Sequence, residues 1–343
     1  MIPHAFGRSE PWSVGIEEEL FVLAADSLSP APFPRTELDG VRFKAELFAA
    51  VVELNTGICG SVADAARELG ELRAEAKRRA ATAGLVLAAC GTWPTAVPEK
   101  QTITDDPGYR RFVEYAGSSA RRQYCSGLHV HVGVASPEAC LTALEAVLPW
   151  LPLVLALSAN SPYLAGRETG LASARAETLA LLPRSGAPPV FASYEEWEAF
   201  AERLLGLGLA DEYTRIWWDV RPHPRYGTLE VRMPDQPTRL ETTAALAALA
   251  HALVVTSDGD TPADRGAYAE NRWAALRFGR DARLIHPDGK RLATVSELLD
   301  ELAARVDEDV LHSVRGLDQA GEQVAVGRRH GLGSLCEQLV ALT

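Results

Sequence analysis

The sequence predicts a domain that mixes strands and helices, taken as one unit from residue 1 to residue 343. Three observations support this. Short segments alternate apolar and polar residues as half-buried strands do, and longer segments have the spacing of amphipathic helices. No internal repeat, low-complexity linker or compositional break divides the chain. The length and the 47% hydrophobic content are ordinary for a globular enzyme with a large core.

Charge and cysteine content narrow the class of protein. The net charge of −12 argues against nucleic acid or an anionic membrane as the main partner. The five cysteines are scattered and form no CxxC pair, which favours a reducing compartment. The first residues lack the apolar core of a signal peptide, and the longest apolar run, residues 146–157, is too short to span a membrane. The sequence therefore predicts a cytoplasmic protein.

The first strand is predicted over Ser13–Leu23 and carries three acids in a row. With period two, Glu17 and Glu19 share a face, while Glu18 points the other way. Adjacent carboxylates disfavour a strand because they repel one another and have low β-propensity. One explanation is an edge strand protected by its charges. The other is a functional site, since broken local patterns tend to mark one.

The segment Phe43–Asn55 is predicted to be a helix, because its apolar residues recur at helical spacing. Glu46 and Glu53 lie on another face of this helix, about 10.5 Å apart along its axis. The simple alternative is a solvated helix face, which holds unless other acids point the same way.

Caps and periodicity predict the remaining elements. These are a helix from Ser61 to Gly84, a strand at Leu85–Cys90, a helix or helix pair at Pro137–Leu157, a helix capped by Ser193, an Ala/Leu helix at Thr242–Thr256, a helix with a hairpin over 270–290, and a helical tail. Residues 158–175 form a Gly- and Ser-rich loop of the kind that contacts substrates.

A strand over Gly127–Val134 places His129 and His131 on one face. A lone histidine is more often structural than a ligand. Two histidines at i,i+2 between valines are a denser, moderate signal for a site.

Residues 214–238 predict two strands joined by a turn, and polar residues alternate along both. The second strand, Thr228–Met233, puts Glu230 and Arg232 on its non-core face. This pair is either an ion pair on a solvated sheet face or a carboxylate for a hard cation beside a phosphate-binding guanidinium.

Four separate segments thus offer acids or imidazoles on regular elements: Glu17 and Glu19, Glu46 and Glu53, His129 and His131, and Glu230. Such a cluster needs cations to coexist, and carboxylate-rich ligation suits Mg²⁺ or Mn²⁺ better than zinc. Candidate anion clamps are Arg175, Arg221, Arg225 and Arg232. Cations beside arginines are what phosphoryl transfer requires. Neither a GxxxxGK[ST] loop nor a GxGxxG after a strand is present, so ATP would bind on a sheet face through metal.

Several motifs carry a resemblance when taken together: VGIEEEL, KAELFAAVVELNTG, GLHVHVG, the loop SP-x4-R-x-TG-x2-S-x-R, IWWDVRP, TLEVR-x-PD and ENRW-x-A-x-RFG, in this order from residue 14 to about residue 285. As a set they resemble the bacterial glutamate–cysteine ligase-like (type 2) carboxylate–amine ligases. The resemblance implies an α+β, glutamine-synthetase-like fold. In that fold a curved, mainly antiparallel sheet holds ATP and divalent metal on its concave face, with helices packed behind.

The resemblance also implies roles for individual residues. The implied metal ligands are Glu17, Glu19, Glu46, Glu53, His129 and Glu230. Arg232 is implied to contact the transferred phosphate and, with Glu53, to be catalytic; His131, Arg175 and Arg221 are implied to bind substrate or phosphate. Two departures from the family pattern are Ala174, where an aromatic residue is usual, and residues 327–330, where an Arg-Gln pair is absent.

The implied activity is an ATP-dependent ligase that joins a glutamate-like carboxylate to an amine such as cysteine through an acyl phosphate, using Mg²⁺ or Mn²⁺. Nucleic acid and membrane are not expected partners, and a homodimer is consistent with base rates while the sequence leaves the oligomeric state open. Two alternatives remain open. A metal-dependent hydrolase or oxygenase using His129, His131 and Glu230 would act without ATP. A binding module would keep the nucleotide pocket without the chemistry.

Overall fold

A seven-stranded sheet forms the centre of the computed structural model, which describes residues 2–256 and 262–343. The strand order is β2-β3-β1-β5-β9-β8, and β4 pairs with the remaining part of β1. The strands are β1 (Val14–Ala24), β2 (Phe43–Ala45), β3 (Val51–Asn55), β4 (Leu85–Ala88), β5 (Leu128–Gly133), β8 (Val220–His223) and β9 (Thr228–Val231). Every pairing in this sheet is antiparallel, as predicted.

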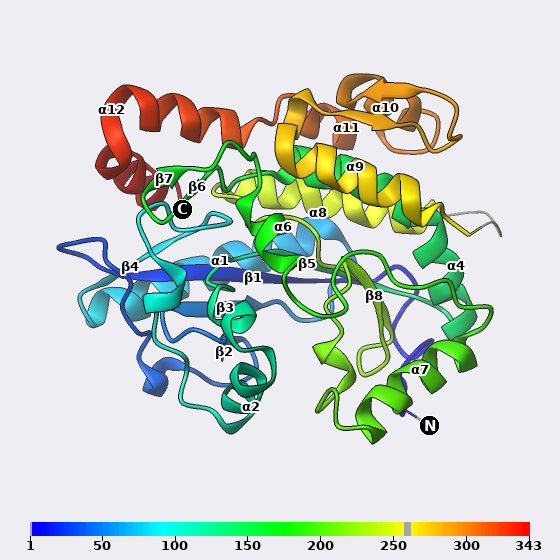
Figure 1. The fold of residues 1–343 in the computed structure, drawn as a ribbon, viewed down its shortest axis with the longest axis horizontal. Helices are drawn as coiled ribbons and strands as arrows, with labels where there is room; N and C mark the ends of the chain where they lie inside the picture. The colour runs from blue at the N-terminus through cyan, green and yellow to red at the C-terminus, as the bar shows by residue number, and fades with distance from the viewer. Residues whose placement is uncertain (1, 257–261) are drawn as a thin grey trace.

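Strand β1 is the central strand of the sheet (Figure 1). One of its edges pairs with β3, and the other pairs with β5 over Val14–Glu18 and then with β4 over Phe21–Ala24. A strand with partners on both sides is not an edge strand. The edge-protection explanation for its three glutamates is therefore wrong.

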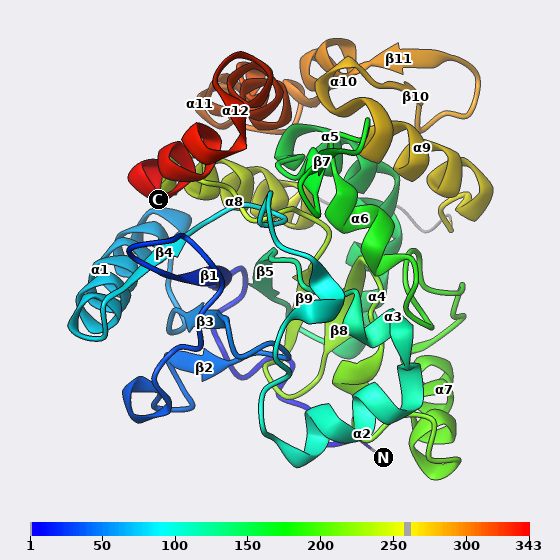
Figure 2. The ribbon, with the colours of Figure 1, turned by 60° about the vertical axis from the view of Figure 1, so that its left-hand side comes forward.

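Helices cover one face of the sheet (Figure 2). They are α1 (Val62–Thr82), which packs on β1, β3 and β4; α8 (Leu240–Val255), which packs on β5; and α4 (Pro137–Val147), which packs on β8 and β9. The local sequence explains where α1 begins and ends. Ser61 accepts a hydrogen bond from Asp64 N, and Gly84 has the positive φ of 69° that terminates many helices.

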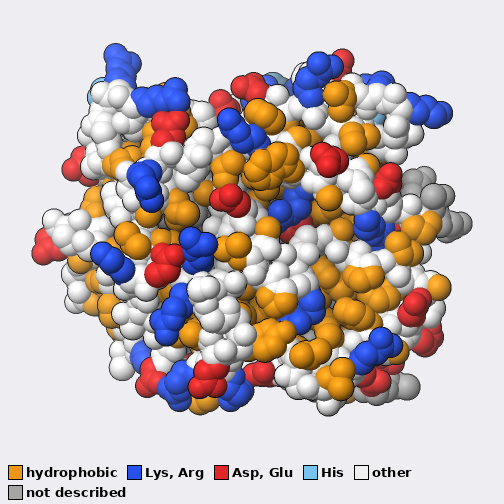
Figure 3. Space-filling view, viewed as in Figure 1, with side chains coloured by type: hydrophobic (Ala, Val, Ile, Leu, Met, Phe, Trp, Pro, Cys, Tyr) orange, Lys and Arg blue, Asp and Glu red, His pale blue; other side chains and the backbone are white. Residues whose placement is uncertain are grey.

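The other elements surround this central pair of layers. They are α2 (Pro107–Ala116), α3 (Ser118–Arg121), α5 (Leu151–Ser158), α6 (Ala174–Leu179), α7 (Tyr194–Gly206), α9 (Arg265–Phe278), α10 (Val295–Leu302), α11 (Glu308–Arg315), α12 (Gln319–Leu342) and the hairpins β6–β7 (Tyr163–Leu164, Arg167–Glu168) and β10–β11 (Arg283–Ile285, Leu292–Thr294). Helices α9 to α12 form the upper part of Figure 1, beyond α8. On the face shown in Figure 3, basic and acidic side chains are intermingled.

One stretch of the described residues, Pro137–Ser158, has the length and composition of a membrane span. It comprises α4 and α5 with a 3-10 turn between them. In its most apolar 18 residues, 67% are buried inside the protein. Apolar helices in the core of a large domain pass the same test, so this stretch is weak evidence for a membrane.

The predicted helix at Phe43–Asn55 is wrong. The segment forms two strands, β2 and β3, joined by a connection that contains Glu46. Ala, Leu and Glu favour a helix when they are considered locally. Here the segment instead pairs with β1, from Glu17 opposite Asn55 to Phe21 opposite Val51, and tertiary pairing of this kind overrides propensity.

Candidate active site

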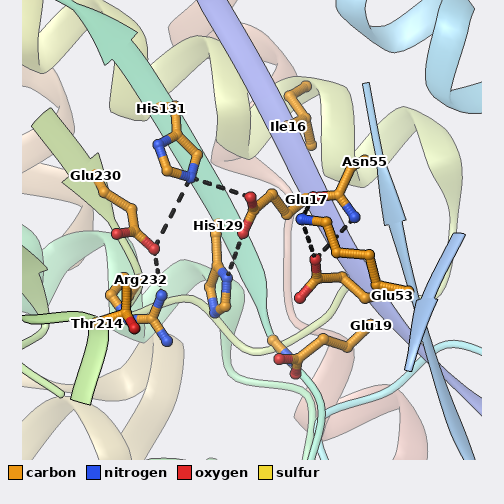
Figure 4. Close-up of polar contacts among 12 residues, drawn as sticks. Ile16, Glu17, Glu19, Glu53, Asn55, His129, His131, Thr214, Glu230 and Arg232 are labelled. Atoms are coloured by element: carbon orange, nitrogen blue, oxygen red, sulfur yellow. Dashed lines mark hydrogen bonds and ion pairs between the residues drawn. The ribbon is translucent and has the colours of Figure 1, made fainter. Parts of the chain in front are cut away.

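The pairing register of the strands places polar residues opposite one another, so that they form rows across the sheet. From the β2 side to the β8 side, successive rows contain Lys44, Glu53 and Glu19; then Asn55, Glu17 and His129; then Gly15, His131, Glu230 and Arg221. Because side chains alternate along a strand, these residues all point to one face. It is the face opposite α1 and α8. Figure 4 shows the side chains of Glu17, His129, His131 and Glu230 directed toward one another there.

Glu19, Glu46 and Glu53 form the first acidic group, in which each carboxylate offers an oxygen within 4.8 Å of the others. Glu19 accepts a hydrogen bond of 2.6 Å from Gly127 N, and Glu53 accepts one of 3.1 Å from Lys44 Nζ. Burial raises the pKa of Glu46 well above its usual range, and the charges of Glu53 and Glu19 raise it further. Three carboxylates this close repel one another unless a cation lies between them.

Glu17, His131 and Glu230 form the second group, again with ligand atoms within 4.8 Å of one another. His131 Nε2 lies 3.4 Å from Glu17 Oε1 and 3.8 Å from Glu230 Oε1. This nitrogen is buried and makes no hydrogen bond to any residue that the structure describes, while His131 Nδ1 lies 2.9 Å from Thr228 Oγ1. With the proton on Nδ1, Nε2 directs a lone pair into the group, as the imidazole of a metal ligand does.

The charges of the second group compensate one another. Burial alone would raise the pKa of Glu17, but His131 and His129 outweigh it and hold the pKa well below its usual range. Burial would also raise the pKa of Glu230. The positive charges of Arg221 and Arg232 outweigh burial and hold this pKa well below its usual range. At His131 burial lowers the pKa, and the carboxylates of Glu17 and Glu230 reverse this and raise it.

The two groups fit divalent cations. Five carboxylates and one imidazole are hard, mainly oxygen ligands of the type that Mg²⁺ and Mn²⁺ prefer. The buried His131 Nε2, which makes no hydrogen bond among the described residues, supports a ligand at the second group. The geometry also refines the expected ligand set, since it brings His131 into the group and leaves His129 beside it, with Nδ1 3.3 Å from Glu17 Oε2.

Two of the predicted anion clamps bracket Glu230. Arg221 Nε donates to Glu230 Oε2 at 2.6 Å, and Arg232 donates to Glu230 Oε1. An ion pair on a solvated face does not describe this arrangement, because the Glu230 side chain is only 1% exposed. Arg225 is exposed at the mouth of the cleft.

Arg175 occupies a different place from the one expected. Its guanidinium donates to the carbonyl oxygens of Met233 at 2.9 Å and Arg232 at 3.2 Å, and it does not line the cleft. A Cβ at Gly127 would lie 2.0 Å from Arg175 Nη2, so the glycine makes room for this contact. Arg175 therefore supports the backbone of Arg232 from behind.

The rows form the floor of a cleft with a volume of about 690 Å³. Residues of α2 and of the segment 212–217 form its far wall. A second pocket of about 440 Å³ adjoins it and is lined partly by Ile58 and Val41. Both cavities share Glu17, Lys44, Arg225 and Tyr226, so they form one elongated space.

Sequence reasoning missed several residues of the cleft, namely Lys44, Asn55, Tyr109, Arg215 and Tyr226. The incorrect helix at Phe43–Asn55 hid the first two. A strand with period two over Val51–Asn55 would have placed Glu53 and Asn55 on one face. The others come from loops and short helices, whose position in the fold no local pattern reveals.

An antiparallel sheet with two mainly carboxylate groups on the floor of a cleft, and helices packed behind, is the predicted glutamine-synthetase-like architecture. The comparison with known families gives the class more narrowly. Residues 13–337 match the family described as Glutamate-cysteine ligase family 2 (GCS2), and the chain belongs to this family of ligases. The predicted resemblance and the predicted enzyme class are thereby confirmed.

Related sequences cover nearly the whole chain. A protein of Rubrobacter xylanophilus named "Putative glutamate–cysteine ligase 2-3" is 39% identical over 98% of this chain and 99% of its own length. A protein of Sorangium cellulosum named "Putative glutamate–cysteine ligase 2" is 37% identical over 90% of this chain and 87% of its own length.

Solved structures confirm the fold. The bifunctional glutathione synthetase of Pasteurella multocida superposes with a TM-score of 0.74 at 16% identity, covering 96% of this chain and 52% of that one. The glutamate–cysteine ligase of Francisella tularensis in complex with AMP gives a TM-score of 0.71 at 14% identity, covering 97% and 89%.

Proposed function

We propose that this protein is an ATP-dependent carboxylate–amine ligase that activates a glutamate-like carboxylate as an acyl phosphate and transfers it to an amine such as cysteine. The observation that carries the proposal is the pair of acidic groups on adjoining rows of one sheet face. One group has compensating histidines and arginines, and the other has carboxylates that repel one another. MgATP beside a substrate carboxylate needs cation sites and guanidinium groups in this arrangement.

The elongated cavity supports an orientation for ATP. The second pocket, with Ile58, Val41 and the ring of Tyr226, is suited to the base and ribose. Gly15 leaves this pocket open, because it is the one position of its row without a side chain. The triphosphate would then pass Lys44 and Arg225 to reach the acidic groups. The solved ligase that was crystallised with AMP supports binding of an adenine nucleotide by this fold.

The proposed reaction has two chemical steps, and the residues of the cleft would bind and orient the reactants in both. In the first, a substrate carboxylate oxygen attacks the γ-phosphorus and the bond to ADP breaks. In the second, the amine attacks the acyl carbon, phosphate leaves, and the amine loses a proton. When bound, Mg²⁺ or Mn²⁺ supplies charge neutralisation at the phosphates. Arg232, held in place by Glu230 and by Arg175 behind it, would stabilise charge on the transferred phosphoryl group.

Release of ADP tests the proposal. Purified protein with MgATP is assayed against a panel of carboxylates, each with and without candidate amines. A particular pair that yields ADP and the amide supports the ligase and identifies its substrates. Activity on any substrate in the absence of ATP, with tight zinc or iron binding, would instead support the hydrolase or oxygenase. The ligase family of the chain favours the first outcome.

Location and assembly remain predictions. A cytoplasmic enzyme with small-molecule substrates and a homodimeric state is the expectation, and fractionation and sedimentation equilibrium would check these two properties.

A further inference from the structure

Among the residues that the structure describes, Arg215 in the wall of the cleft has no acidic partner. Arg215 ends the short 3-10 helix at Tyr213–Arg215 and lines the same cavity as Glu46 and Glu53. Within residues 2–256 and 262–343, no carboxylate lies at ion-pair distance from its guanidinium, and its buried Nε has no hydrogen-bond partner.

The other cations of the cleft differ from Arg215. Arg221 and Arg232 both bind Glu230, and Lys44 donates to Glu53 and to Asn55. Arg35 donates to a main-chain carbonyl, and Arg225 is exposed on the side of the second pocket. Within the described part of the chain, Arg215 is thus a half-buried positive charge without an acceptor, and it lines the main cleft but not the proposed nucleotide pocket.

Aromatic rings hold the Arg215 guanidinium in place. It lies 5.7 Å from the ring centroid of Tyr109 and 5.5 Å from that of Phe112, both on α2. Tyr109 is fixed in turn, because its hydroxyl donates to Ala45 O at 3.0 Å. Of the two acids on this wall, Asp106 accepts from Gly108 N and Tyr109 N as the N-cap of α2, and Glu212 is exposed. The rings therefore orient the guanidinium without neutralising its charge.

This position suits a second carboxylate of the acid substrate. The planar fork of an arginine matches a carboxylate with two hydrogen bonds, and a buried donor without an acceptor carries a desolvation penalty. Tyr109 links the two places, because the Arg215 guanidinium lies over its ring and its hydroxyl donates to the carbonyl oxygen of Ala45, which precedes Glu46 in the chain. A molecule with one carboxylate at the acidic groups and another on Arg215 would thus occupy neighbouring sites.

We propose that Arg215 binds the carboxylate of the acid substrate that is not activated, and so selects a dicarboxylate such as glutamate. This inference rests on the ligase function proposed above. It makes Arg215 a specificity-determining residue whose removal affects one substrate and not the nucleotide.

The test compares glutamate with isoglutamine, in which the α-carboxylate is an uncharged amide and the γ-carboxylate is kept. Wild type, Arg215→Gln, Arg215→Lys and Arg111→Gln are assayed for ADP formation with each acid at saturating amine. Arg111 is a matched control, because it is a nearby arginine on α2 that already has an acid, Asp211, at 3.0 Å. Melting curves verify that each variant folds.

We expect wild type and Arg111→Gln to prefer glutamate by about 10- to 100-fold in kcat/KM, the range for one charge-assisted contact. Arg215→Gln should remove this preference through KM for glutamate, with KM for ATP unchanged, and Arg215→Lys should keep part of it. The inference is overturned, and the ligase proposal survives, if Arg215→Gln keeps the preference or if wild type uses both acids equally. No ADP with any carboxylate and amine overturns the ligase proposal, and this inference with it.

Discussion

The two faces of strand β1 both carry glutamate, but the glutamates have different partners on each face. Glu18 points toward the helices and is fully buried, where Arg73 binds it through Nε at 2.7 Å and Nη2 at 2.5 Å. Thr243 Oγ1 and Gln236 Nε2 donate to it as well. Its neighbours Glu17 and Glu19 point into the cleft, toward other carboxylates and histidines.

The difference shows how a structural acid is distinguished from a ligand. Four donor groups of the protein satisfy the charge of Glu18, so nothing further has to bind there. Around Glu19, the neighbouring acids Glu46 and Glu53 raise the electrostatic free energy, and a bound cation would lower it. The sequence EEE is uniform, and only the partners supplied by the fold separate the roles.

The largest expected effect is on stability, at Glu18. Arg73→Met leaves a buried carboxylate without its cation, so the free energy of unfolding should fall by about 3–5 kcal/mol. Urea denaturation of wild type and variant measures the change. The double variant Glu18→Met, Arg73→Met removes both charges and should recover part of the loss. An unchanged midpoint for Arg73→Met would show that the pair contributes nothing.

On the cleft face, we expect the reverse pattern. Glu53→Gln keeps the size of the side chain and removes one charge of the first acidic group, so kcat/KM should fall about 10²- to 10³-fold, the range for losing one electrostatic contact to a transition state. The melting temperature of the Glu53→Gln variant without added metal should stay close to that of wild type. The substitution removes the repulsion between the carboxylate at position 53 and those of Glu46 and Glu19. Full activity would exclude Glu53 from the site.

A smaller effect is expected at Gly15, on the same face of β1 one row beyond Glu17. An added Cβ would lie 3.8 Å from Gly57 O and His131 Cβ, an ordinary contact. Gly15→Val should therefore fold but narrow the proposed nucleotide pocket, raising KM for ATP by about tenfold, equivalent to about 1.4 kcal/mol. Gly15→Ala is the control with a milder change. Equal KM values for both variants and wild type would place the nucleotide elsewhere.

The smallest effect is a pH dependence at Glu46. Its raised pKa means that, above the ordinary value of 4.5, the folded metal-free protein binds more protons than the unfolded chain. The free energy of unfolding should therefore decrease as pH rises through the window between 4.5 and the raised pKa. Affinity for Mn²⁺ should increase over the same window, because the ion displaces the proton. Titration calorimetry at several pH values measures this slope, and Glu46→Gln should flatten it.

Much of the fold was predictable where the signal is local. The shared faces of Glu17 with Glu19, and of His129 with His131, follow from period two, and the register shows both pairs on one side of the sheet. The helix starts at Ser61 and Ser193 follow from capping, and both serines accept the expected backbone hydrogen bond. The helix predicted at Phe43–Asn55 was wrong because local propensity competed with pairing to a strand far away in the sequence.

The sequence by itself determined the family, the alternation of the site strands and the residue types for a cation and phosphate site, because these depend on motifs and on neighbours in the chain. Only the tertiary structure decided which partners meet. It placed Glu46 against Glu19, paired Glu18 with Arg73 and put Arg175 behind Arg232. It also left Arg215 without an acid among residues 2–256 and 262–343. Distances across strands and loops depend on register and packing, which a single sequence read locally does not contain.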